Sequence, residues 1–163
     1  MYLNEIFKLQ EELDSRIRME HNLENVNLVD KKILSFLVEL GELANETRCF
    51  KYWSKKSASE RSIILEEYVD GFHCLVSIGI ELNFNSILDA NIPSSTNDDL
   101  TEAFNLTYEK IIDLKNNKTY DYYLSLFSTF LSLGESLGFS RTEVFEAYKK
   151  KNEKNHKRQD SGY

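Results

Sequence analysis

The sequence is short of residues that interrupt regular structure: its 163 residues include one proline and six glycines. A fold of many short strands needs frequent turns, which usually contain these residues, so their scarcity argues against an all-β protein. Apolar residues recur instead every three or four positions, which is the spacing of one helical face. The sequence therefore predicts an all-α fold, a bundle of long helices.

Cysteines and long apolar runs are also scarce. The two cysteines, Cys49 and Cys74, lack the paired spacing of a zinc site or a redox motif. The N-terminus has no charged and then apolar signal sequence, and the longest apolar run, residues 120–137, is interrupted by Asp121 and Glu135. We therefore expect no membrane span and a reducing, cytoplasmic compartment. A chain of this length is expected to form one domain, residues 1–163.

The net charge of −7 is unevenly distributed. Residues 149–158 contain six basic residues and one Glu, so this segment carries +5 and the rest of the chain −12. An acidic body argues against direct nucleic-acid binding. A basic C-terminal segment, about residues 149–163, suits a compact anionic ligand such as a phosphate chain, although a solvated basic tail is the simpler interpretation.

Two pairs of acidic residues occur at helical spacing. Glu39 and Glu42 are three residues apart, as are Glu67 and Asp70, so each pair lies on one face of a helix. Four carboxylates that meet across a helix pair repel one another unless a cation holds them, and an all-oxygen set suits Mg²⁺. A Mg²⁺ site in turn implies a phosphate-bearing ligand. The alternative, a solvated acidic face, fits the second pair poorly, because residues 72–82 of its helix are apolar nearly all round.

Apolar spacing and two capping boxes, at residues 57–60 and 140–143, define the expected helices. The helix that carries Glu67 and Asp70 should start near Ala58 and form the buried centre of the bundle. The preceding helix should bury the side formed by Ile33, Leu34, Leu37, Leu40, Gly41 and Ala44. The expected helices span residues 3–20, 29–49, 58–84, 100–114 and 120–137, with a last helix from the second capping box.

Several single residues have both a structural and a functional interpretation. Gln10 and Asp14 share a face of the first helix, and an exposed polar pair is the simpler interpretation. Trp53 could stack on a planar ring or plug a helix junction. His73, within an apolar helix, is expected to be a hydrogen-bonded core residue. One face of the last helix carries three polar residues that could grip phosphate oxygens: Lys151, Asn155 and Arg158.

Together these residues resemble the all-α nucleoside triphosphate pyrophosphohydrolases, and specifically the dimeric dUTPases. The superfamily's metal-binding pattern is matched by Glu39-x-x-Glu42, 24 intervening residues and Glu67-x-x-Asp70. The subfamily is indicated by Leu9-Gln10, by residues 48–53 (Arg-Cys-Phe-Lys-Tyr-Trp) and by the pattern Lys-Asn-x-x-Asn-x-x-Arg-Gln at residues 151–159. The likeness covers most of the chain and is weakest over residues 85–139.

The resemblance implies a homodimeric enzyme that uses Mg²⁺ to convert dUTP, and also dUDP, to dUMP. It assigns metal binding to Glu39, Glu42, Glu67 and Asp70. It assigns the phosphate clamp to Lys151, Asn155 and Arg158. It assigns the base pocket to Gln10, Asp14, Trp53 and His73.

Two of these residues have roles that the resemblance specifies further. Glu39 would also orient and deprotonate the attacking water. Asp14 departs from the family pattern, which tends to have Asn at this position. An ionised Asp accepts a hydrogen bond but cannot donate one, so the departure bears on base recognition.

Two other functions stay open on the sequence alone. The same chemistry could act on another base, as in related housecleaning pyrophosphohydrolases. The acidic face could instead bind a protein partner and no metal. The family that the chain resembles also includes phage-encoded members that bind repressor proteins, so a repressor partner could coexist with enzyme activity.

Overall fold

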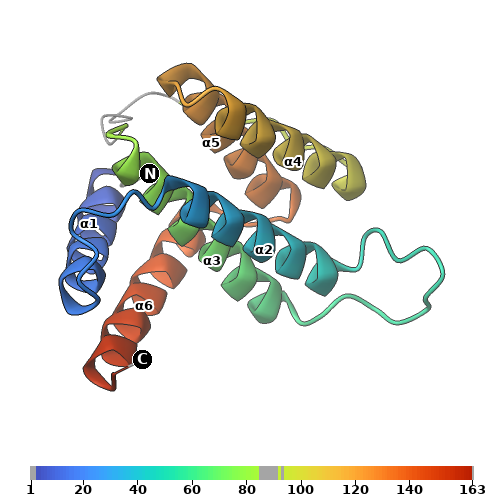
Figure 1. Ribbon diagram of the computed structural model, residues 1–163. Helices are drawn as coiled ribbons and strands as arrows, with labels where there is room; N and C mark the ends of the chain where they lie inside the picture. The colour runs from blue at the N-terminus through green and yellow to red at the C-terminus, as the bar shows by residue number, and fades with distance from the viewer. Residues whose placement is uncertain (1–2, 85–91, 93, 163) are drawn as a thin grey trace.

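The computed structural model describes residues 3–84, 92 and 94–162, and these residues form six α-helices and no strand (Figure 1). This confirms the all-α prediction. The helices are α1 (Leu3–Glu20), α2 (Val29–Thr47), α3 (Arg61–Glu81), α4 (Leu100–Asn116), α5 (Tyr120–Ser136) and α6 (Arg141–Asp160). None of the described helices is long and apolar enough to cross a membrane.

The α2/α3 hairpin lies at the centre of the bundle. Helices α1 and α6 pack on one side of it, and α4 and α5 pack on the other (Figure 1). Helix α3 contacts α1, α2, α5 and α6, and its residues are buried in an almost unbroken run from Tyr68 to Gly79. The expectation of a buried central helix is confirmed, and the acidic residues at the start of this run are thereby held at the edge of the core.

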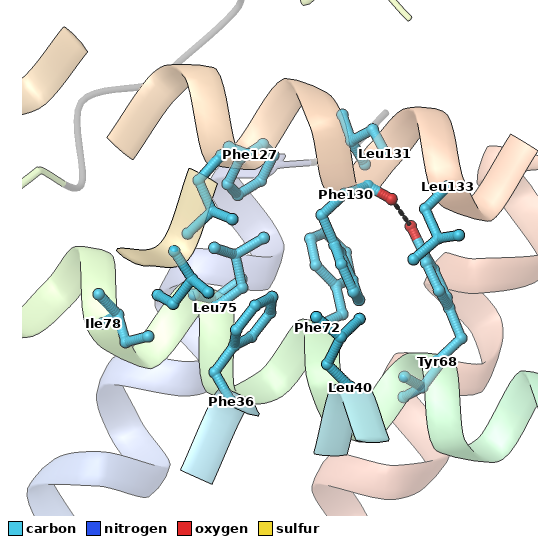
Figure 2. Close-up of a cluster of buried hydrophobic side chains, with 14 of the residues drawn as sticks. Phe36, Leu40, Tyr68, Phe72, Leu75, Ile78, Phe127, Phe130, Leu131 and Leu133 are labelled. Atoms are coloured by element: carbon cyan, nitrogen blue, oxygen red, sulfur yellow. Dashed lines mark hydrogen bonds between the residues drawn. The ribbon is translucent and has the colours of Figure 1, made fainter. Parts of the chain in front are cut away.

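Aromatic side chains fill the space between α3 and α5 (Figure 2). The rings of Tyr68 and Phe130 stack with their centroids 4.6 Å apart, and Phe72 packs beside both. The Tyr68 hydroxyl donates a hydrogen bond of 3.1 Å to the Phe130 carbonyl oxygen (Figure 2). Because such interiors are close-packed, these contacts fix the position of the α3 turn that carries Glu67.

The first capping box was predicted wrongly. Helix α3 begins at Arg61 rather than near Ala58, and its N-cap residue, Glu60, makes no side-chain capping bond. Ser59 instead bonds to Glu46 of α2 through both its hydroxyl and its backbone N–H. In the predicted box Ser57 would be the N-cap and would accept from the N–H of residue 59 or 60. The Ser59 N–H bonds instead to the Glu46 carbonyl oxygen, and the chain stays non-helical up to Glu60.

The buried side of α2 also differs from the prediction. Leu34 is 62 % exposed, whereas Phe36 and Leu43 are fully buried. Because α2 packs against both α3 and α4, its buried arc is rotated toward Phe36. The two apolar residues that flank the acidic side of α2 are thus core residues, which keeps that side close to the protein interior.

The basic C-terminal segment is helical rather than a loose tail. The second capping box is confirmed: the Ser140 hydroxyl accepts from the Glu143 N–H, and the Glu143 side chain accepts from the Ser140 N–H. Helix α6 then continues to Asp160 and packs against α1 and α3. The interpretation of this segment as a solvated tail is wrong.

Candidate functional site

Three of the four predicted metal ligands meet between α2 and α3. Carboxylate oxygens of Glu39, Glu67 and Asp70 all lie within 4.8 Å of one another. Glu42 is exposed one turn along α2 and does not belong to this group, although its charge acts on Glu39 and Glu67. We call Glu39, Glu67 and Asp70 the carboxylate cluster.

The cluster is electrostatically unfavourable without a cation. Burial, together with the nearby charges of Asp70, Glu42 and Glu67, raises the pKa of Glu39 to about 7. Burial is also the main cause of the raised pKa values of Glu67 and Asp70. Carboxylates at this spacing ionise together only when positive charge is supplied, and oxygen-only ligands fit a hard divalent cation.

One lysine from α6 supplies part of that positive charge. Lys151 Nζ lies 2.6 Å from Asp70 Oδ2 and 3.0 Å from Glu66 Oε1. Lys154 also reaches Glu66 Oε1 at 3.0 Å. Arg158, two turns beyond Lys151, acts in the same direction: its positive charge offsets part of the rise that burial causes in the pKa of Asp70. The structure therefore brings two residues of the predicted phosphate clamp, Lys151 and Arg158, to the edge of the carboxylate cluster.

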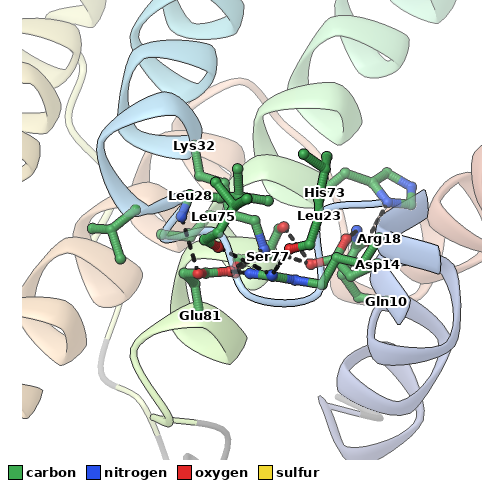
Figure 3. A network of polar contacts seen from close by, with 12 residues as sticks. Gln10, Asp14, Arg18, Leu23, Leu28, Lys32, His73, Leu75, Ser77 and Glu81 are labelled. Atoms are coloured by element: carbon green, nitrogen blue, oxygen red, sulfur yellow. Dashed lines mark hydrogen bonds and ion pairs between the residues drawn. The ribbon is translucent and has the colours of Figure 1, made fainter. Parts of the chain in front are cut away.

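A second polar group, which we call the Asp14 network, lies where α1 meets α2 and α3 (Figure 3). Asp14 Oδ1 accepts a hydrogen bond of 2.8 Å from Gln10 Nε2. Asp14 Oδ2 accepts from Lys32 Nζ at 2.9 Å and from Ser77 Oγ at 2.5 Å. Gln10 is only 4 % exposed, so the interpretation of Gln10 and Asp14 as an exposed pair is wrong. Helix α1 turns this face toward α3 and α6, which a single-helix pattern does not reveal.

His73 joins the same network, as expected of a hydrogen-bonded core histidine. Its Nδ1 lies 2.7 Å from Gln10 Oε1, and its ring stacks on Tyr148 with centroids 3.7 Å apart. The Tyr148 hydroxyl donates to the same Gln10 oxygen at 2.6 Å. Burial lowers the pKa of His73 to about 3, so its imidazole is neutral.

The carboxylate cluster and the Asp14 network lie along one side of the α2/α3 hairpin. Seven residues separate Lys32 from Glu39 on α2, and seven separate Asp70 from Ser77 on α3. Seven residues are two helical turns, or about 10 Å. Cys74 lies between the two groups: burial, together with the charges of Glu39, Asp70 and Asp14, raises the pKa of its thiol to about 12. A ligand with a phosphate chain at one end and a planar base at the other could span this distance.

Trp53 is not a junction plug. It lies in the loop between α2 and α3, is 65 % exposed, and has ring contacts with Phe50 and Tyr52 of the same loop. Figure 1 shows this loop reaching away from the bundle at the end opposite α1. Within one chain, Trp53 and His73 therefore do not line a common pocket.

Sequence reasoning missed four residues that complete these groups: Lys32, Glu66, Ser77 and Tyr148. Lys32 and Ser77 lie seven residues from Glu39 and Asp70, so they share a helix face with the carboxylate cluster. That seven-residue spacing could have predicted both residues from the sequence. Glu66 and Tyr148 are brought in by the packing of α6, for which the sequence carries no comparable signal.

Comparison with known proteins identifies one family. A family model described as dUTPase matches residues 2–163 of the chain. Among curated proteins, no relative matches at a significant level. The family match spans both the carboxylate cluster and the Asp14 network. Enzymes of this family generally require a divalent metal ion, and the carboxylate cluster is a suitable place for it.

Proposed function

Because the chain belongs to the dUTPase family, it hydrolyses dUTP to dUMP, and we propose that it does so with Mg²⁺ held at the carboxylate cluster. The observation that carries the proposal is the convergence of Glu39, Glu67 and Asp70 within 4.8 Å at the edge of the core. Burial and mutual repulsion make this arrangement costly unless a cation is bound. A structural role alone does not account for three carboxylates placed so closely.

The proposed division of roles follows the positions of the side chains. Glu39, Glu67 and Asp70, with Glu42 at the rim, hold the metal, and Glu39 also orients the attacking water and accepts its proton. When bound, Mg²⁺ supplies positive charge to the phosphate chain and makes nearby water more acidic. Lys151, Asn155 and Arg158 clamp the phosphate oxygens from the α6 side.

The base is assigned to the other end of the hairpin. Gln10 reads the uracil edge, Asp14 supports it, and His73 forms part of the wall. This placement is supported by the spacing of about two helical turns between the network and the cluster. Trp53 is assigned to base binding by family likeness alone. Its loop lies at the end of the bundle opposite α1 (Figure 1), so its exposed ring could stack on a base only in the site of a second chain of the proposed dimer.

Several further features belong to the proposal. We expect dUDP to be a second substrate and the working unit to be a homodimer. The free thiols of Cys49 and Cys74 fit a reducing compartment such as the cytoplasm. A repressor protein partner is a further expectation if the chain is encoded by a phage.

The decisive experiment measures release of pyrophosphate from dUTP with and without Mg²⁺, beside dTTP and dCTP. We expect turnover of dUTP that depends on Mg²⁺, with little turnover of the other two nucleotides. Equal turnover of all three would favour a housecleaning enzyme of broader base specificity. Hydrolysis of dUTP that is unaffected by chelation of divalent metal would contradict the metal assignment.

Glu39→Gln tests the site itself. It should lower kcat by about 10²–10⁴-fold, because it removes a metal ligand and the proton acceptor together. Calorimetric titration should show weaker Mg²⁺ binding, which a role in protein binding alone would leave unchanged. Glu109→Gln, at an exposed position of α4, is the matched control and should retain activity.

A further inference from the structure

The C-terminal end of α6, which carries two residues of the proposed phosphate clamp, is fastened to α1 by one arginine. We propose that Arg16 is a positioning residue for the clamp. It holds the last two turns of α6 in place before dUTP binds, so that Asn155 and Arg158 meet the phosphate chain in a preformed arrangement. This inference deepens the proposed function and rests on it, because the clamp is part of that proposal. Arg16 itself has no assigned role in metal, phosphate or base binding.

The last two turns of α6 have no core packing of their own. The buried residues of this helix end at Asn152, and none of residues 153–160 is buried. A helix end without packed side chains frays, because little buried apolar area opposes its local unfolding. The segment that carries Asn155 and Arg158 therefore depends on polar contacts with a neighbouring helix to stay ordered.

Arg16 supplies these contacts from α1. Its Nη2 donates a hydrogen bond of 2.7 Å to Asp160 Oδ1, and its Nη1 donates one of 3.1 Å to the carbonyl oxygen of His156. Its Nε donates to Glu20 Oε1 at 2.7 Å, which fixes the guanidinium on the surface of α1. A guanidinium is a rigid fork of five donors, so one side chain can bind both helices at once. Its positive charge is also favourable at the carbonyl end of a helix.

The side of α6 that is fastened adjoins the side that carries the clamp. Asn152, His156 and Asp160 follow one another at i, i+4 and i+8, so they share the side that faces α1. Asn152 Nδ2 donates to the Leu9 carbonyl oxygen at 3.2 Å, and Arg16 holds the other two positions. The clamp residues at positions 151 and 155 directly precede two of these residues, so they lie about 100° around the helix axis. Fixing the first side against α1 therefore fixes the direction in which the clamp points.

Amide hydrogen exchange tests the fastening without substrate or metal. Arg16→Met keeps the apolar stem and removes the hydrogen bonds, so the amides of residues 157–160 should exchange about three- to tenfold faster. The amides of residues 144–152 should keep their rates. Because the buried residues of α1 end at Leu13, the variant should show an unchanged helical signal in circular dichroism. Unchanged exchange at residues 157–160, or equal acceleration along the whole chain, would overturn the inference.

The other end of α6 offers a matched control. Arg61 of α3 fastens the start of α6: its Nη2 donates to Glu143 Oε2 at 3.0 Å and to the Gly138 carbonyl oxygen at 2.9 Å. Arg61→Met makes the same chemical change as Arg16→Met at the opposite end of the helix. It should therefore leave the exchange of residues 157–160 unchanged.

Asp160 provides a test in which the two accounts differ in sign. A negative charge at the C-terminal end of a helix opposes the helix dipole, and Ala has the higher helix propensity. In an unfastened helix, Asp160→Ala would therefore slow exchange in the last turn. Because Asp160 binds Arg16, we expect faster exchange instead, in the same residues as in Arg16→Met. Slower exchange would contradict the proposal.

Steady-state kinetics test whether the fastening positions the clamp. When only a fraction of the molecules is competent to bind, KM rises by the inverse of that fraction, whereas kcat of the saturated enzyme changes little. Arg16→Met should therefore raise KM for dUTP about two- to fivefold at nearly constant kcat, and Arg61→Met should change neither. Faster exchange with an unchanged KM would contradict the positioning role. If the wild type does not hydrolyse dUTP, the proposed function fails, and the exchange measurements alone decide whether Arg16 fastens α6.

Discussion

Single residues gain their chemistry from the groups packed around them, and Glu39 illustrates this. Its carboxyl is half-buried between two helices and faces three other carboxylates. An isolated Glu-x-x-Glu pair on an exposed helix would have carboxyl groups close to their ordinary pKa. The motif indicated the kind of ligand, but the raised pKa depends on distances that only packing creates.

The raised pKa of Glu39 predicts an unusual pH dependence of the free energy of unfolding for metal-free protein. A carboxyl whose pKa rises on folding, here to about 7, stabilises the fold below its unfolded pKa of about 4.5, and this contribution is lost as pH rises through 7. Chemical denaturation of chelator-treated protein should therefore show a loss on the order of 1–2 kcal/mol between pH 5 and 8, after allowance for solvent screening. Glu39→Gln should lose less over the same range, and added Mg²⁺ should restore the wild type. Parallel curves for wild type and variant would rule out this account.

At the scale of elements, the packing of a whole helix decides which of its side chains reach the core and which reach the site, as α6 shows. Its N-terminal half packs Val144, Phe145 and Tyr148 into the core. Its C-terminal half brings Lys151 and Arg158 to the carboxylate cluster. The charge pattern of residues 149–158 indicated an anionic ligand, yet whether the segment was a tail or a helix depended on α1 and α3.

Arg158→Ala should separate the catalytic role of α6 from its structural role. Arg158 lies near the end of the helix, so its loss removes the proposed phosphate contact and little core packing. We expect activity to fall by about 10-fold or more, with an unchanged helical signal in circular dichroism. Lys157→Ala, at the exposed neighbouring position, serves as control. Loss of helical signal in Arg158→Ala would instead mean that the side chain is structural.

The close approach of α3 and α5 at Gly134 leads to a prediction about stability. A Cβ added at Gly134 would collide with the ring and hydroxyl of Tyr68, which adjoins Glu67 in the sequence. Gly134→Ala should therefore destabilise the protein by about 1–3 kcal/mol in urea unfolding, despite the better helix propensity of Ala. Gly41→Ala is the matched control, because its Cβ would meet only the Tyr108 hydroxyl, at 3.3 Å. Equal stability of the two variants would show that Tyr68 can move aside.

At the scale of the whole molecule, we expect the working unit to be a dimer. Light scattering should give a mass of about twice the 19.1 kDa of one chain. The outer side of α2 exposes Leu34 (62 %) and Val38 (50 %) one turn apart, and a charged residue in such a patch disrupts association. Leu34→Glu should therefore shift the mass toward the monomer, whereas Met19→Glu, at the exposed end of α1, should not. A monomeric wild type at micromolar concentration would contradict this prediction.

The one-domain organisation and the roles of the individual site residues stay predictions, whereas the fold class and the family are established. The helical class, the central position of α3 and the pairing of acidic residues could all be predicted, because local spacing determines which side chains share a helix face. The first capping box could not be evaluated locally, because the Ser59 N–H, which Ser57 would cap, bonds to the Glu46 carbonyl oxygen of another helix.

The sequence alone determined the chemistry that is available: acidic pairs at i and i+3, a basic final helix and a buried central helix. Only the tertiary structure decided that Glu42 lies at the rim of the cluster, that Trp53 is exposed, and that Gln10 and Asp14 are buried. The physical reason is that periodicity acts within one helix, whereas burial and partner choice depend on the angle at which helices pack. The Asp14 network depends on both, because Gln10 and Asp14 share a face of α1 but meet Lys32, Ser77 and Tyr148 only where α2, α3 and α6 pack against that face.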